Sequence, residues 1–240
     1  EEARLIYKGV ARLHPANVPR LVVDIGGRST ELILGQGRNP RHAESFHVGC
    51  VSLSLKYFPD GEVTAEAFRA AQVAAGAELE EGLETFAPGR WQEALGSSGT
   101  VSAVSQLLAA SGVSNGRITA EGLRWMILRC IEAGNVERLA LPGLKDERRL
   151  VIAGGVAILY TLATQFGIED LRPTQGALRQ GVIFELDERR HAAARHQVGH
   201  DARDASVRDM QRRFMVDTRQ AQRVGRVAQQ LYRQAQPRAG

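Results

Sequence analysis

The feature that most constrains this chain is the octet Asp24–Glu31, which reads Asp-Ile-Gly-Gly-Arg-Ser-Thr-Glu between two apolar runs. Leu21–Val23 leads into it and Leu32–Leu34 leads out of it. Aliphatic runs on both sides of turn-forming residues predict a strand, a tight turn and a second strand. A Walker-type phosphate loop is excluded, because it needs Gly-Lys-Ser/Thr at the start of a helix.

The turn of this hairpin has the composition of an anion-binding site. Gly26 and Gly27 allow a positive φ and a close approach of the backbone to a ligand. Turn N–H groups form an anion-binding concavity, to which Ser29 and Thr30 add hydroxyl donors. A hard metal ion would bind Asp24, with phosphate oxygens completing its shell. An ordinary hairpin remains the alternative, since Asp and Gly are common turn residues.

Composition narrows the class of protein. The chain has 240 residues, enough for one large domain or two smaller ones. No apolar run approaches membrane-spanning length, and the start does not read as a signal peptide. Cys50 and Cys130 lack metal-ligand spacing, so we expect buried free thiols in a cytoplasmic protein and no membrane association.

Basic residues gather at the end of the chain. Residues 187–240 hold 12 of the 31 Lys and Arg residues and only 6 of the 27 Asp and Glu residues. A polyanion could bind such a segment, although a solvated helix face would have the same composition. Aromatic residues do not alternate with these arginines, which disfavours nucleic acid as a partner.

Periodicity along the chain predicts an α/β domain. We expect helices at 2–13, 65–84, 101–110 and 119–133, and strands at 20–24, 30–35, 42–48, 91–95 and 168–171. The apolar run at 150–153 ends at Gly154 as a strand would, and a helix is expected to follow. Asp24, Gly96 and Gly154 could then line one cleft, because ligands bind beyond the carboxyl ends of strands. The turn Gly96–Thr100 precedes a helix, so it suits either an anion or close strand–helix packing.

The chain resembles the exopolyphosphatase/guanosine pentaphosphate phosphatase family, part of the actin, sugar-kinase and heat-shock ATPase superfamily. The resemblance covers about residues 1–230. Besides the octet, it rests on these segments: Glu1–Tyr7, Gly49–Leu53, Gly96–Thr100, Leu141–Leu144 and Gly176–Val182. It implies a ribonuclease H-like (actin-type ATPase) domain with a mixed sheet flanked by helices, followed by the start of an all-helical domain.

This resemblance also implies a domain organisation. Residues 1–186 would be the second lobe of the α/β domain, 187–203 a linker and 204–240 the truncated start of the helical domain. The first lobe and most of the helical domain of the relatives would be absent. We therefore expect the isolated chain to have weak activity or none, because half a cleft loses much of its power to position a substrate.

Catalytic roles follow from the same resemblance. Glu2 matches the family's catalytic glutamate, the general base for an attacking water, although Glu1 is adjacent. Asp24 and Glu31 are similar to the family's catalytic acids, which would hold Mg²⁺. From the residues alone, Glu1 and Glu2 would simply favour the helix dipole, Asp24 would cap its turn, and Glu31 would be an exposed strand residue.

The phosphate cradle would be formed by the turn residues Gly26, Gly27, Arg28, Ser29 and Thr30. Arg28 is a departure, because many relatives carry a third glycine there. Its guanidinium suits phosphate, and its side chain disfavours a positive φ. Either Arg28 contacts the substrate, which we favour, or it points to solvent with ordinary backbone.

The function we expect is an exopolyphosphatase that releases terminal phosphate from inorganic polyphosphate by metal-assisted attack of water. The closest alternative is a guanosine pentaphosphate phosphohydrolase, because both substrates end in the same phosphoanhydride. A non-catalytic phosphate- or nucleotide-binding module is the alternative of another class, and a kinase of the same superfamily is a third. A homodimer is among the assemblies that the resemblance implies.

Overall fold

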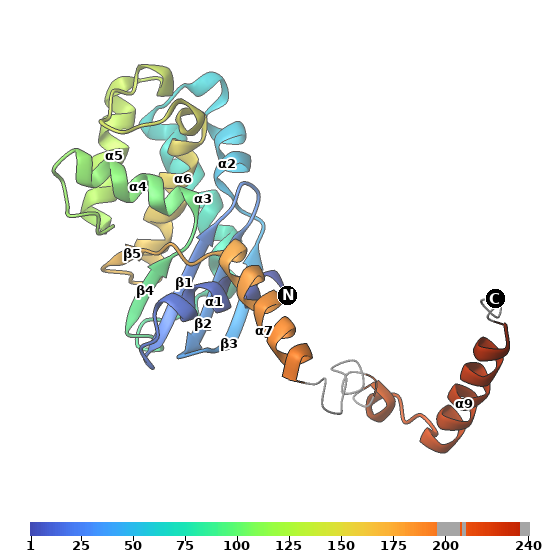
Figure 1. Ribbon diagram of the computed structural model, residues 1–240. Helices are drawn as coiled ribbons and strands as arrows, with labels where there is room; N and C mark the ends of the chain where they lie inside the picture. Colours follow the sequence, from blue (N-terminus) through green and yellow to red (C-terminus); the bar gives the residue numbers. More distant parts are fainter. Residues whose placement is uncertain (196–206, 208–209, 236–240) are drawn as a thin grey trace. The chain divides into compact units, whose positions relative to one another are not determined.

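The computed structural model describes residues 1–195, 207 and 210–235 (Figure 1). It divides into two units, Glu1–Glu185 and Leu186–Gly240. Helix α7 (Leu178–Arg195) begins in the first unit and ends in the second. In the described part of the second unit, the main element is the amphipathic helix α9 (Thr218–Ala235). Among the described residues, no helix has both the length and the apolar character needed to cross a membrane.

A mixed five-stranded sheet forms the centre of the first unit, as the sequence predicts. Its strands are β1 (Pro19–Ile25), β2 (Thr30–Gln36), β3 (Asn39–Phe46), β4 (Glu93–Gly96) and β5 (Leu171–Pro173). The order across the sheet is β3-β2-β1-β4-β5. The first three strands are antiparallel neighbours, whereas β4 lies parallel to both β1 and β5.

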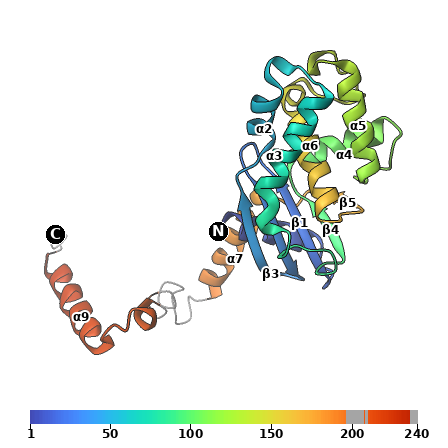
Figure 2. The same ribbon diagram turned by 180° about the vertical axis from the view of Figure 1, so that it is seen from behind.

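Helices cover both faces of this sheet, because its central strands bury side chains on both sides. On one face, Val22, Ile33 and Leu95 pack with the apolar side of α1 (Glu2–Leu13). On the other face, Leu21, Val23 and Ile25 belong to the main core, together with side chains from helices α2–α6. Figures 1 and 2 show α1 beside one face and α3 and α6 beside the other. The helices of the second face are α2 (Cys50–Tyr57), α3 (Ala65–Leu79), α4 (Gly99–Ala110), α5 (Ala120–Ala133) and α6 (Asp146–Gln165).

The expected strand end at Gly154 is wrong, because residues 146–165 form the single helix α6. A β-carbon at Gly154 would lie 2.6 Å from the carbonyl oxygen of Cys50, and one at Gly155 would lie 2.5 Å from Cγ2 of Thr100. These two glycines let α6 approach α2 and α4 closely. Gly154 therefore serves helix packing and does not line a cleft at the sheet.

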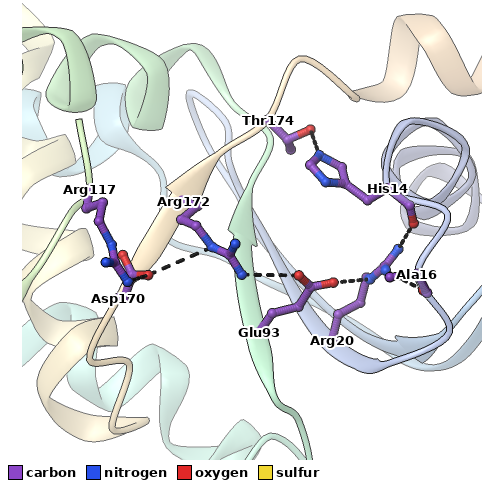
Figure 3. A network of polar contacts seen from close by, with 8 residues as sticks. All are labelled: His14, Ala16, Arg20, Glu93, Arg117, Asp170, Arg172 and Thr174. Carbon is purple, nitrogen blue, oxygen red and sulfur yellow. Dashed lines mark hydrogen bonds and ion pairs between the residues drawn. The ribbon is translucent and has the colours of Figure 1, made fainter. Parts of the chain in front are cut away.

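The amino ends of β1 and β4 carry a chain of alternating charges (Figure 3). The guanidinium of Arg20 is fully buried and donates from Nε to Glu93 at 2.9 Å. Its other nitrogens donate to the carbonyl oxygens of His14 at 2.7 Å and Ala16 at 2.8 Å. Glu93 also pairs with Arg172 on β5, at 3.2 Å. Arg20 thus joins the end of α1 to the sheet.

The segment expected as a linker, 187–203, begins inside α7, which continues to Arg195. The rest of that segment and residues 204–206 lie outside the described residues. The apolar side chains Val224, Val227 and Leu231 form one side of α9, and each is more than half exposed.

Candidate active site

A row of four polar side chains crosses the sheet at the carboxyl end of β1. Asp24 lies directly opposite Glu31 in the β1–β2 register, and Glu31 lies opposite Ser45 on β3. Ser97 follows β4, and its backbone N–H donates to the carbonyl of Val23 at 2.9 Å. Side chains alternate between the faces of a sheet, so this row projects from the same face as Val22 and Leu95. That is the face covered by α1.

Each carboxylate in this row accepts a hydrogen bond from a serine. The Ser97 hydroxyl donates to Oδ2 of Asp24 at 2.5 Å, and the Ser45 hydroxyl donates to Oε1 of Glu31 at 2.9 Å. Residues directly opposite on antiparallel strands have β-carbons roughly 4.5–5.5 Å apart, so the two carboxylates repel each other. The serines fix one oxygen of each acid and leave the other oxygen available to a ligand.

Burial raises the pKa of Asp24, and the nearby charges of Glu31 and Glu2 raise it further. The hydrogen bond from Ser97 acts in the opposite direction. A partly buried carboxylate directly opposite another is a costly arrangement, which a bound cation would offset. Such perturbed acids gather at functional sites.

The first turn of α1 lies on the same side of the sheet as the row, since Ala3 packs against the cluster that contains Val22 and Leu95. The charge of Glu2 also contributes to the raised pKa of Asp24. Its neighbour Glu1 is held differently, because Oε1 of Glu1 pairs with Arg4 at 2.8 Å. No hydrogen bond or ion pair within the described chain engages the Glu2 carboxylate. Of the two acids, Glu2 is therefore the one available to a ligand beside Asp24.

The turn after β1 points its carbonyl groups at α2. Cys50 N–H donates to the Gly26 carbonyl at 3.0 Å, and Val51 N–H donates to the Gly27 carbonyl at 2.9 Å. Gly49 permits this contact, since a β-carbon there would lie 2.3 Å from the nitrogen of Arg28. These hydrogen bonds anchor the turn to the start of α2 through the carbonyls of Gly26 and Gly27.

Not every predicted cradle residue has a free donor. Gly26 N–H donates to the carbonyl of Ser29 at 2.8 Å, and the buried Thr30 hydroxyl donates to the carbonyl of Val48 at 2.6 Å. Gly27, Arg28 and Ser29 keep backbone N–H groups that no acceptor in the described chain receives. Gly26 and Thr30 therefore brace the turn, and the next three residues after Gly26 face outward.

The expected positive φ at the two turn glycines is wrong, because neither has one. Close packing explains why glycine suits these two positions. A β-carbon at Gly27 would lie 3.3 Å from Cγ2 of Val51, and one at Gly26 would lie 3.2 Å from the Ser29 carbonyl oxygen. Arg28 likewise has an ordinary negative φ, and its side chain is exposed beside the turn. The arginine thus fits this backbone without strain.

The Gly96–Thr100 turn supports the site from the β4 side. Ser98 caps α4 by accepting from Val101 N–H at 3.1 Å, and a β-carbon at Gly96 would lie 2.4 Å from the Val101 side chain. Thr100 donates to the Ile25 carbonyl at 3.3 Å. Close packing explains these residues, whereas Ser97 contacts a site carboxylate directly.

Sequence reasoning missed Ser97 and Ser45 as site residues. Ser97 stands in the Gly96–Thr100 turn, which the sequence predicts to suit either an anion or close strand–helix packing. Ser45 has no local signal at all, because only the pairing of β2 with β3 places it beside Glu31.

Mg²⁺ fits the acids that converge here. This ion is commonly held by one or two carboxylates, with water and substrate phosphate supplying the remaining oxygens. Asp24 and Glu31 provide that pair. Within the described residues, no group of three or more Asp, Glu, His or Cys side chains could hold an ion by itself.

The sheet order, the hairpin and the carboxylate row define an α/β domain of the actin-type ATPase class. The model of the Ppx/GppA phosphatase family matches residues 1–190, and the chain belongs to this family.

Solved structures share the fold. A Ppx/GppA phosphatase from Aquifex aeolicus is 23% identical with a TM-score of 0.64, and the alignment covers 77% of this chain and 62% of that one. An exopolyphosphatase from Cytophaga hutchinsonii is 19% identical with a TM-score of 0.65, covering 77% and 62%. An exopolyphosphatase-like protein is 20% identical with a TM-score of 0.65, covering 78% and 66%. The chain thus spans about 62% of the length of the Aquifex protein.

Proposed function

We propose that this chain carries the phosphate cradle and the catalytic acids of an exopolyphosphatase, which releases terminal phosphate from inorganic polyphosphate. One observation carries the proposal: Asp24 and Glu31 stand opposite each other at the two ends of a turn in which the N–H groups of Gly27, Arg28 and Ser29 have no acceptor in the described chain. Phosphoryl transfer depends mainly on positioning and charge stabilisation, and this arrangement provides for both.

The residues divide the work between binding and proton transfer. N–H groups of Gly27, Arg28 and Ser29 bind the oxygens of the terminal phosphoryl group, and the Ser29 hydroxyl and Arg28 guanidinium add donors. Glu2 orients a water molecule and accepts its proton. Attack of the water oxygen on phosphorus breaks the bridging P–O bond, and the shortened chain leaves with the bonding electron pair.

Asp24 and Glu31 are the residues that would hold Mg²⁺. When bound, the ion would neutralise the negative charge of the substrate phosphates. Ser97 and Ser45 keep one oxygen of each acid engaged, so the pair retains its orientation whether or not substrate is present.

Guanosine pentaphosphate is the alternative substrate. A cavity of about 140 Å³ lies beside Gly99 and is lined on its other side by Lys145 and Arg148. The Arg148 guanidinium reaches Gly99 at the start of α4, since a β-carbon there would lie 2.5 Å from its NH2 atom. The lining also includes Glu147, so Lys145 and Arg148 leave the cavity a small excess of positive charge. This charge suits a substrate with further anionic groups, which a nucleotide and a polyphosphate both have.

Phosphate release from long-chain polyphosphate, measured with Mg²⁺ in the full-length protein, tests the proposal. Guanosine pentaphosphate serves as the parallel substrate, and the ratio of the two kcat/KM values identifies the preferred substrate. Glu2→Ala should slow release by about a hundredfold to ten-thousandfold, whereas Glu1→Ala, the matched control one position away, should retain it. No release from either substrate would instead favour a phosphate- or nucleotide-binding module.

A further inference from the structure

The first turn of α1 carries Glu2 and lies before the fully buried part of the helix. The buried side chains of α1 lie between Ile6 and Ala11, and before them the small, partly buried side chain of Ala3 packs against the same cluster. Before them, Glu2 is exposed, and Arg4 and Leu5 are only partly buried. At this end of the helix, contact with the sheet is therefore made through the small side chain of Ala3, which leaves room for a second element to hold the turn.

Helix α7 touches this turn through its backbone. A β-carbon at Gly181 of α7 would lie 1.8 Å from the carbonyl oxygen of Leu5, a distance that no side chain tolerates. One helical turn further along α1, a β-carbon at Gly9 would lie 2.3 Å from the carbonyl oxygen of Ala177. The two helices thus meet at glycines, where backbone packs on backbone with no side chain between them.

A carboxylate from α7 completes the contact. Oε2 of Glu185 pairs with Arg4 at 3.3 Å and with Lys8 at 2.5 Å. The Glu185 side chain is only 18% exposed, so this pairing is shielded more than a surface ion pair. Arg4 also pairs with Oε1 of Glu1 at 2.8 Å, so these ion pairs link Glu185 to the N-terminal end of α1.

We propose that Glu185 and Gly181 are positioning residues, which hold the first turn of α1 so that Glu2 stands beside Asp24. This inference rests on the function proposed above. Neither residue contacts substrate; both act through Glu2. A base displaced by about 1 Å can lose on the order of a hundredfold in rate, whereas binding at a separate turn is unaffected.

The test compares Glu185→Ala with Asp187→Ala in the full-length protein, using long-chain polyphosphate and Mg²⁺. Asp187 is a suitable control because it lies on the same helix, and its partner Arg190 also belongs to α7. Glu185→Ala should lower kcat about tenfold to a hundredfold with KM changed less than about twofold. Asp187→Ala should match the unaltered protein. Equal values of kcat for the two variants would overturn the proposal.

A double-mutant cycle separates positioning from a general loss of structure. If Glu185 acts through Glu2, then Glu185→Ala should have no further effect on kcat in a Glu2→Ala background. A further drop of the same size would show that Glu185 acts elsewhere. Failure of the proposed function gives a different result, namely that Glu2→Ala itself leaves kcat unchanged.

Hydrogen exchange supplies a readout that does not depend on activity. The Leu5 N–H donates to the Glu1 carbonyl at 3.1 Å, within the turn in question. Both Glu185→Ala and Gly181→Ala should accelerate exchange in a peptide covering residues 1–8, while peptides from β1 and β2 keep their protection. Unchanged exchange in residues 1–8 would contradict the proposed role of α7.

Discussion

Arg20 and Arg172 form a natural pair for testing how much burial strengthens an ionic contact. Both bind the carboxylate of Glu93, but Arg20 is 0% exposed and Arg172 is 50% exposed. Arg20→Met keeps a side chain of similar length, yet removes the buried one of the two partners of Glu93 and leaves the carbonyls of His14 and Ala16 without their donor. Breaking a buried pair of this kind costs about 3–5 kcal/mol.

Thermal unfolding followed by circular dichroism measures this cost. For a protein of this size, each kcal/mol lowers the Tm by about 2–4 °C, so Arg20→Met should lower it by about 6–20 °C. Arg172→Met, the matched control, breaks a half-exposed pair worth about 0–1 kcal/mol and should lower the Tm by about 4 °C at most. Equal shifts in the two variants would refute the argument from burial.

Three further predictions concern the site. Burial raises the pKa of Asp24 above its ordinary value of 3.8, so the unfolded chain loses this proton at a lower pH than the folded chain does. The free energy of unfolding therefore falls as pH rises from the unfolded to the folded pKa. At neutral pH, Asp24→Asn should therefore unfold at a higher urea concentration than the unaltered protein, and this gain in stability should vanish below pH 3.8. A gain in stability that persists below pH 3.8 would contradict burial of the ionised carboxylate as its cause. Ser45→Ala should weaken Mn²⁺ binding by about tenfold to a hundredfold in calorimetry, because Glu31 loses its orienting donor, and an unchanged affinity would exclude that role. Arg28→Ala should raise KM for polyphosphate by roughly tenfold or more, whereas Arg38→Ala, in an exposed loop, should not; equal effects would point to general attraction of the polyanion.

The carboxylate pair could be predicted from the sequence because its geometry is local. Asp24 and Glu31 stand at the two ends of one short turn, so the hairpin places them close together, although the family resemblance was needed to read them as a pair. From the residues alone Glu31 was expected to be exposed, and this is wrong, because it is 5% exposed. The two serines could not be found in this way. Their places depend on the order β3-β2-β1-β4, in which β4 comes from a segment far along the chain.

The error at 150–153 has a similar origin. A short apolar run does not distinguish a buried strand from a buried helix, and the glycines that follow suggested a strand end. In the structure these glycines allow α6 to pack closely against α2 and α4, and no local sequence pattern reveals such contacts. Thr30 is a comparable case: its hydroxyl was expected to meet phosphate, but the pairing of β2 with β3 buries it against Val48.

The position of the three acids along the chain also bears on the order in which the site forms during folding. A hairpin closes within microseconds, and it brings Asp24 and Glu31 together without help from distant segments. Glu2 joins them only after α1 has docked, which requires both the sheet and α7. A refolding protein should therefore regain affinity for a divalent cation before it regains hydrolysis, and the delay between the two would time the docking of α1.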